Sequence, residues 1–188
     1  MTFPLSDDMA NGLGNEAYLF PASFVQEKWG KLDKSQPECL AYNITSVLRL
    51  QGKLNLSALL HSNAALVSRH ETLRTHFVTI HGSFQQCVVP NLTIALPLID
   101  LRPLKKEEQL TLIQPIAQDE ARRSFHLAHG PLIRTTLLWL DDEEYLLLLT
   151  LHRSIADAWS VSIWSRELNA LYISFAAGSP LSLPELPI

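Results

Sequence analysis

A histidine and an aspartate stand five residues apart within residues 149–160, where an apolar run gives way to a short polar stretch. We interpret this segment as a strand that ends near His152, a loop that carries Asp157, and a helix that follows. Catalytic groups are commonly displayed at such junctions. The same pattern is also typical of a buried histidine at a strand end and an aspartate that caps a helix. Composition alone favours this structural interpretation.

A charged cluster made of Arg69, Glu71 and Arg74 follows an apolar helical pattern. It is either a binding site or a partly buried network of ion pairs that fixes the exit of the helix. We favour the network, because lone buried charges are costly and need partners.

The nearby histidines do not form a metal-binding pattern. His70, His76 and His81 are separated by six and five residues, which suits neither one face of a helix nor a Cys/His knuckle. Cys39 and Cys87 also lack the spacing of metal ligands. We therefore expect no bound metal, and two ordinary thiols of the kind that a reducing cytosol maintains.

The composition indicates one folded unit without a strong electrostatic signature. The chain has 188 residues, of which 47% are hydrophobic and 18% charged, with a net charge of −4. This content suits the core of one domain, or of one lobe of a larger domain. No lysine and arginine cluster exceeds two adjacent residues, which argues against a nucleic-acid partner. Short apolar runs and the absence of a secretory signal predict a cytoplasmic protein with no membrane partner.

Hydrophobic periodicity and turn residues predict an α+β layered sandwich. Helices are expected over 23–32, 55–70, 105–125 and 159–177, and strands over 41–51, 75–80, 84–89, 96–101, 132–140 and 145–151. The last strand lacks alternation, which is typical of a central strand buried on both faces. Pro115 predicts a kink or a new helix start inside the third helix. Trp159 and Trp164 are assigned to the core side of the last helix.

Three blocks of sequence occur in the order found in the condensation domains of nonribosomal peptide synthetases. Ser23, Gln26 and Trp29 have the spacing of the family's first motif. Residues 69–77, Arg-His-Glu-Thr-Leu-Arg-Thr-His-Phe, match the second motif at every specified position. Residues 152–158, His-Arg-Ser-Ile-Ala-Asp-Ala, align with the third motif, His-His-x-x-x-Asp-Gly. The chain therefore resembles the N-terminal lobe of these domains.

The resemblance implies a fold like that of chloramphenicol acetyltransferase, a two-layer α/β sandwich with a mixed sheet. Residues 1–18 would form a flexible lead-in, 19–178 the lobe, and 179–188 a proline-rich tail where a second lobe would begin. In the family, two lobes enclose a tunnel that admits two carrier proteins, each with a thioester on a phosphopantetheine arm. The chain itself would bind no cofactor directly. The residues that match the first two motifs would be structural: Ser23, Gln26, Trp29, Arg69, His70, Glu71 and Arg74.

The third motif departs from the family at the position closest to the chemistry. Its second histidine, which in the family lies beside the attacking amine, is Arg153 here. A guanidinium stays protonated and cannot accept a proton, although it can bind an oxyanion or a carboxylate. His152 and Asp157 keep the other two motif positions, and this aspartate is generally structural in the family. Ala158 replaces the motif's glycine, which is a mild change unless φ is positive there.

Two functions remain open from the sequence, beside a third interpretation in which the chain is an evolutionary remnant or an excised fragment with no independent function. The first is an auxiliary module of nonribosomal peptide or related carrier-dependent biosynthesis, which binds a carrier protein or a complementary lobe. The second is an oligomeric acyltransferase that acts on carrier-protein or CoA thioesters at subunit interfaces, with His152 as the base and Arg153 as an anion clamp. Under both, the surface that a second lobe would cover predicts self-association or a dedicated partner.

Overall fold

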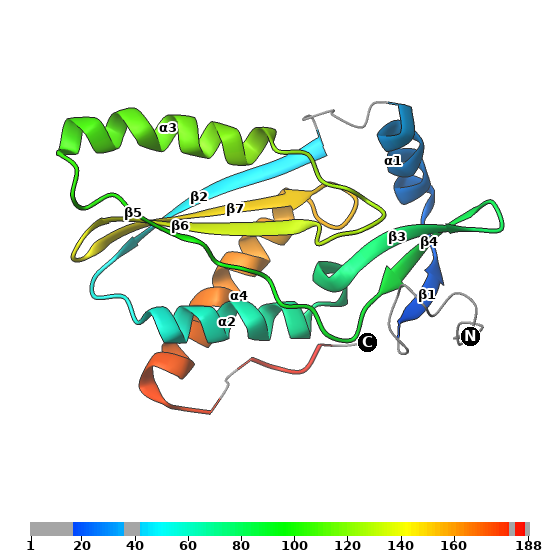
Figure 1. Ribbon diagram of the computed structural model, residues 1–188. Helices are drawn as coiled ribbons and strands as arrows, with labels where there is room; N and C mark the ends of the chain where they lie inside the picture. The colour runs from blue at the N-terminus through cyan, green and yellow to red at the C-terminus, as the bar shows by residue number, and fades with distance from the viewer. Residues whose placement is uncertain (1–16, 36–41, 181–182, 187–188) are drawn as a thin grey trace.

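The computed structural model describes residues 17–35, 42–180 and 183–186 (Figure 1). Most of the expected lead-in and Cys39 lie outside these ranges. A four-stranded sheet carries helices on both faces, and a three-stranded sheet lies at one end of it (Figure 1). This mixed, layered arrangement confirms the predicted α+β sandwich.

The larger sheet places the strand that carries the third motif at its centre. Its order is β2-β7-β6-β5, formed by Asn43–Gln51, Glu144–His152, Ile133–Asp141 and Leu98–Asp100. β5 is parallel to β6, and the other neighbours are antiparallel. Along β7, Leu147 and Leu149 pack in one apolar cluster, whereas Leu146 and Leu148 pack in another on the opposite face. Because both faces are covered, this strand has no reason to alternate in polarity.

Helices complete the two apolar layers. α2 (Leu56–Arg69) and α4 (Ala158–Ala177) pack together on one face of the sheet, and α3 (Lys106–Arg122) covers the other face (Figure 1). The Asn55 side chain caps α2 by accepting from the Ala58 N–H at 3.1 Å. Gly178 ends α4 in the left-handed conformation, at a φ of 63°. Both boundaries match the sequence prediction.

The smaller sheet supports the first helix. Its order is β1-β4-β3, formed by Tyr18–Pro21, Ser83–Val88 and Thr75–Ile80, and α1 spans Phe24–Ser35. A Cβ atom added to Gly30 of α1 would lie 2.5 Å from the Phe84 ring, so only glycine allows this close approach. Phe84 in turn stacks on Phe77, with ring centroids 5.1 Å apart. α1 is thereby held directly against the β3–β4 hairpin.

The structure excludes one of the two alternatives predicted at Pro115 and corrects the prediction for Trp159. α3 runs through Pro115 as one helix, so no new helix begins there. Pro115 is exposed, and the carbonyl that loses its partner can bond to water. Trp164 is buried as predicted, but Trp159 is 74% exposed. Five residues correspond to about 140° around a helix, so Trp159 cannot share the buried stripe of Trp164.

Candidate functional site

The third motif connects the end of β7 to the start of α4. His152 is the last residue of β7, and a short loop leads to Ala158, the first residue of α4. The His152 N–H donates to the Leu132 carbonyl at 3.0 Å, and the Arg153 N–H donates to the Tyr42 carbonyl at 2.8 Å. The backbone that carries the motif is therefore fixed from two sides.

The His152 side chain is buried, with 3% exposure. Its Nδ1 accepts from the Ser154 N–H at 3.1 Å and lies 2.8 Å from Ser154 Oγ. An Nδ1 that accepts from an N–H carries no proton, so the neutral ring has its proton on Nε2. The rings of Tyr42 and Phe125 meet the imidazole edge-on, with centroid distances of 6.1 and 6.0 Å. Burial lowers the pKa of His152 to about 4, which keeps it neutral at pH 7.

Arg153 differs from its neighbour in being exposed. Within the described part of the chain, its guanidinium has no ion-pair or hydrogen-bond partner. Its donors are therefore open to solvent or to an anionic ligand. The alanine that follows the aspartate brings no strain, because His81 is the sole described non-glycine residue with a positive φ.

Asp157 caps α4. Its Oδ1 accepts from the Ser160 N–H at 2.8 Å and from the Ser160 hydroxyl at 2.7 Å. The Asp157 N–H donates to Ser160 Oγ at 3.1 Å, which completes a reciprocal capping box. These hydrogen bonds, led by the one from the Ser160 backbone, lower the pKa of Asp157. The carboxylate thus serves the helix start and does not reach His152 through any described hydrogen bond.

The first motif lies against the loop of the third. Gln26 Oε1 accepts from the Ser23 N–H at 2.8 Å, and Ser23 Oγ accepts from the Gln26 N–H at 3.3 Å. Gln26 Nε2 donates to the Ser154 carbonyl at 3.3 Å and to Gln86 Oε1 at 3.0 Å. Trp29 meets Tyr42 edge-on, with centroids 4.9 Å apart. The structure therefore brings the first and third motifs together.

The second motif forms a charged network with α4. Arg69 Nε donates to Glu167 Oε2 at 3.1 Å, and His70 Nε2 lies 2.7 Å from the same oxygen. Arg69 Nη2 also donates to the Pro184 carbonyl at 2.6 Å. The sequence analysis did not identify Glu167. The available signal was an acidic residue three positions after Trp164, within the apolar stripe of α4.

The other two charged residues of the second motif, Arg74 and Glu71, lie outside the network around Glu167. Arg74 Nη1 donates to the Val89 carbonyl at 2.7 Å, whereas the Arg74–Glu71 ion pair is long, at 3.8 Å, and Glu71 is exposed. His70, in contrast, lies beside the third motif. It shares a cavity of about 110 Å³ with Ile155 and Ala156 of the motif loop.

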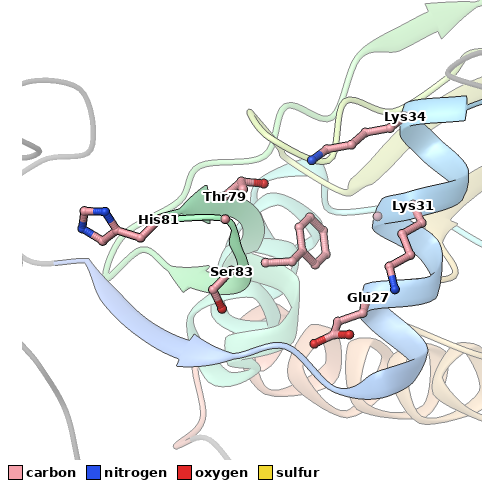
Figure 2. A pocket seen from close by; sticks show the side chains of 9 residues that line it. Glu27, Lys31, Lys34, Thr79, His81 and Ser83 are labelled. Carbon is pink, nitrogen blue, oxygen red and sulfur yellow. The ribbon is translucent and has the colours of Figure 1, made fainter.

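A separate cleft of about 520 Å³ lies between α1 and the β3–β4 hairpin (Figure 2). Lys31 and Lys34 line it from α1, and Thr79 and Ser83 line it from the hairpin (Figure 2). Glu27 is the one acidic residue of its described lining. The cleft therefore has a cationic rim. Sequence reasoning missed it because the lysines and the hairpin are far apart along the chain.

The geometry limits the chemistry that the third motif can perform. The lone pair of His152 Nδ1 is used by Ser154, and Arg153 has no lone pair with which to take a proton. In this geometry the donors of Arg153 are open to an anion, and the Nδ1 lone pair of His152 is engaged by Ser154. The described residues contain no cluster of three or more metal-ligating side chains, and no described helix has the length and apolarity to cross a bilayer.

Comparison with known proteins places this chain among condensation domains. The family model described as "Condensation domain" matches residues 17–187. A linear gramicidin synthase of Brevibacillus parabrevis is 38% identical over 168 residues, which cover 89% of this chain and 2% of that protein. Phosphinothricin tripeptide synthetase PhsC of Streptomyces viridochromogenes is 35% identical, over 89% of this chain and 16% of that protein. The chain belongs to the condensation-domain family.

Solved structures agree with this assignment. The starter condensation domain of rhizomide synthetase RzmA has a TM-score of 0.83 at 15% identity, over 90% of this chain and 40% of that one. SgcC5 from Streptomyces globisporus has a TM-score of 0.75 at 28% identity, over 88% of this chain and 39% of that one. The likeness confirms the expected chloramphenicol acetyltransferase-like fold. The chain spans about two fifths of these solved proteins and corresponds to a single lobe of the domain.

Proposed function

We propose that this chain is an auxiliary module of nonribosomal peptide biosynthesis that binds a carrier protein or a complementary lobe and does not itself form amide bonds. One observation carries this proposal. The two adjacent side chains at the centre of the third motif are a buried neutral imidazole with an occupied Nδ1 and an exposed guanidinium. Neither is arranged to take a proton from an attacking amine.

The exposed apolar side chains near the motif suit a complementary lobe as a partner. Phe24 is 93% exposed at the start of α1, and Trp159 is 74% exposed at the start of α4. The Gln26–Ser154 hydrogen bond links α1 to the loop that precedes α4. Large exposed apolar side chains are the kind of surface that a protein partner covers. A complementary lobe is the occupant that we favour, because this chain matches a single lobe of the solved condensation domains.

The cationic cleft suits a carrier protein, which is typically acidic in this family. Lys31 and Lys34 lie on one face of α1 beside the cleft and form no ion pair with any described carboxylate (Figure 2). Such unpaired cations attract an acidic partner and accelerate its association, with a strong dependence on salt. The phosphopantetheine arm would arrive with the carrier, since the cofactor belongs to that partner.

Binding and catalysis are tested by two measurements. The first is calorimetric titration of the chain with a holo carrier protein from a gramicidin-type synthase. We expect binding that weakens with salt and that weakens at least tenfold in Lys31→Glu/Lys34→Glu. Lys53→Glu, an exposed control outside the cleft, should bind like the wild type. Equal binding by the double variant would exclude this docking surface.

The second measurement follows amide formation between two loaded carrier proteins by mass spectrometry. The chain is combined with the C-terminal half of a gramicidin synthase condensation domain. We expect no product with Arg153, and product with Arg153→His, because histidine restores a group that can accept a proton. Equal activity of the two would overturn the role assigned to Arg153.

The oligomeric acyltransferase is the competing function, and it depends on His152. In that mechanism the imidazole accepts a proton, which its burial and its bonded Nδ1 oppose. An acyl-thioester transfer assay with the chain alone decides between the two. Activity that disappears in His152→Ala would establish the acyltransferase, and the absence of transfer in the wild type would support the auxiliary module.

A further inference from the structure

A second cavity, of about 270 Å³, lies apart from the residues of the third motif. It is formed by the start of β3, the segment after β4 and the turn that contains Gly130. Among the described residues, its walls combine cationic or titratable side chains with apolar ones and include no acidic residue. The lining consists of Arg74, Thr75, His76, Val89, Leu92, Ala128, His129, Gly130 and Pro131.

His76 is the most informative residue of this cavity. It is 8% exposed and has no hydrogen-bond partner among the described residues. The ring nitrogens of His76 are not among the described buried polar atoms that lack a partner, so they keep access to solvent. Because His76 lines the cavity, a ligand there can take the place of water at these nitrogens. The family's second motif specifies no residue at this position, so the motif does not account for the histidine.

Arg74 supplies a fixed positive charge at the same cavity. Its Nη1 donates to the Val89 carbonyl at 2.7 Å, and its Nε donates to the Ser68 carbonyl at 3.3 Å. These neutral acceptors hold the guanidinium in place without balancing its charge. Within the described ranges, Glu71 is its one carboxylate neighbour, at 3.8 Å and exposed to solvent. The described ion pair of Arg74 is therefore a long one, and its guanidinium lines this cavity.

The remaining walls restrict the size and polarity of a ligand. Val89, Leu92 and Pro131 present apolar surface, and the volume of about 270 Å³ equals that of about nine water molecules, which leaves room for an aliphatic tail beside a carboxylate. His129 adds a second imidazole at the exposed rim. The combination suits an anionic head with a short hydrocarbon tail.

We propose that this cavity binds a small aliphatic carboxylate, with Arg74 and His76 on the carboxylate and Val89, Leu92 and Pro131 around its tail. The site uses neither the third motif nor the cationic cleft of Lys31 and Lys34, so it does not rest on the proposed function. A guanidinium and an imidazole N–H give the carboxylate charge-assisted hydrogen bonds, which are stronger than neutral ones.

The site has a defined response to pH. Burial, followed by the nearby His129, lowers the pKa of His76, so the empty cavity holds a neutral His76 at pH 7. A bound carboxylate favours the protonated imidazole and raises that pKa. Binding therefore takes up a proton and becomes tighter as the pH falls. The other titratable or charged groups near His76 are Arg74, Glu71 beside Arg74, His129 with its ring neighbour His126, and the Cys87 thiol opposite in the strand register.

Nuclear magnetic resonance of the full chain, labelled at histidine, tests the proposal. Sodium butyrate is titrated at pH 7 and at pH 6, with butyramide as the neutral analogue of the same shape. We expect butyrate to shift the His76 ring resonances, to bind more tightly at pH 6, and to raise the pKa of His76. Butyramide should produce no saturable shift.

Two variants assign the contacts. His76→Gln should weaken butyrate binding about tenfold, the loss expected for one hydrogen bond to a charged group. His81→Asn is the matched control, because His81 lies outside this cavity and asparagine tolerates its positive φ of 47°. Equal butyrate affinity in His76→Gln and wild type overturns the proposal, and so does equal binding of butyramide. Inorganic phosphate that binds more tightly than butyrate would overturn the choice of a carboxylate.

Discussion

The side chain of Gln26 joins the first motif to the third, because its Nε2 donates to the Ser154 carbonyl at 3.3 Å. The other end of the same amide accepts from the Ser23 N–H at 2.8 Å and caps α1. The amide accepts through its oxygen and donates through its nitrogen, whereas a carboxylate of the same shape can only accept. The glutamine therefore positions α1 relative to the loop that follows His152.

Gln26→Glu should lower the free energy of unfolding by about 1–2 kcal/mol. Glutamate keeps the acceptor for Ser23, but it loses the donor for Ser154 and Gln86 and places negative charge beside both oxygens. Urea denaturation at pH 7 measures the change. Lys28→Gln, an exposed control on α1, should alter stability by less than about 0.5 kcal/mol. Wild-type stability of Gln26→Glu would show that the amide bridge contributes nothing.

The second motif allows a similar test at Glu167. Glu167→Gln should lower the free energy of unfolding by about 2–4 kcal/mol, because it removes the carboxylate that Arg69 and His70 share. The neighbouring exposed residue provides the control, and Arg166→Gln should be close to neutral. In a double-mutant cycle with Arg69→Met, a coupling energy near zero would contradict the network.

This network illustrates what the sequence could and could not predict about the site. The cluster at Arg69 indicated buried charges that need partners, and the three motifs identified the segments that carry them. The acceptor, Glu167, lies 98 positions from Arg69. No local rule of spacing pairs residues at that distance. The two cavities and the contact between the first and third motifs depend in the same way on how the elements pack.

The fold was predictable where local chemistry decides it. Asn55 and Gly178 set the helix ends through capping, and the leucine run of β7 marked a strand buried on both faces. One prediction failed where solvent exposure was the deciding factor, because Trp159 falls outside the buried stripe of α4 although it is strongly apolar. At Pro115 the structure excludes only a new helix start, since α3 continues through this exposed residue.

His152 should make the stability of the protein depend on pH. Its pKa is lowered from 6.5 to about 4 in the folded state, so at pH values between these two the unfolded chain binds a proton that the folded chain does not. Stability should therefore fall as the pH drops from 6.5 to about 4, by up to about 3 kcal/mol. His76, whose pKa is also lowered, adds to the same trend.

Urea denaturation at a series of pH values measures this effect, and His152→Asn isolates it. Asparagine retains an acceptor for Ser154 and does not titrate. The difference in stability between wild type and variant should shrink steadily as the pH falls below 6.5. His61→Gln, which replaces an exposed histidine, should keep the wild-type slope. An unchanged slope in His152→Asn would mean that His152 is protonated in the folded protein at the ordinary pH.

The exposed apolar side chains at the starts of α1 and α4 should drive self-association when no partner is present. Phe24 and Trp159 are large apolar side chains that are 93% and 74% exposed, and burying them against a second copy is favourable. Size exclusion coupled to light scattering should show a mass that rises with concentration. Phe24→Ser/Trp159→Ser should remain monomeric, whereas Leu110→Ser, at an exposed position on α3, should associate like the wild type. A discrete trimer that requires Trp159 would favour subunit-interface sites and the acyltransferase hypothesis, and a strictly monomeric wild type would contradict this use of the surface.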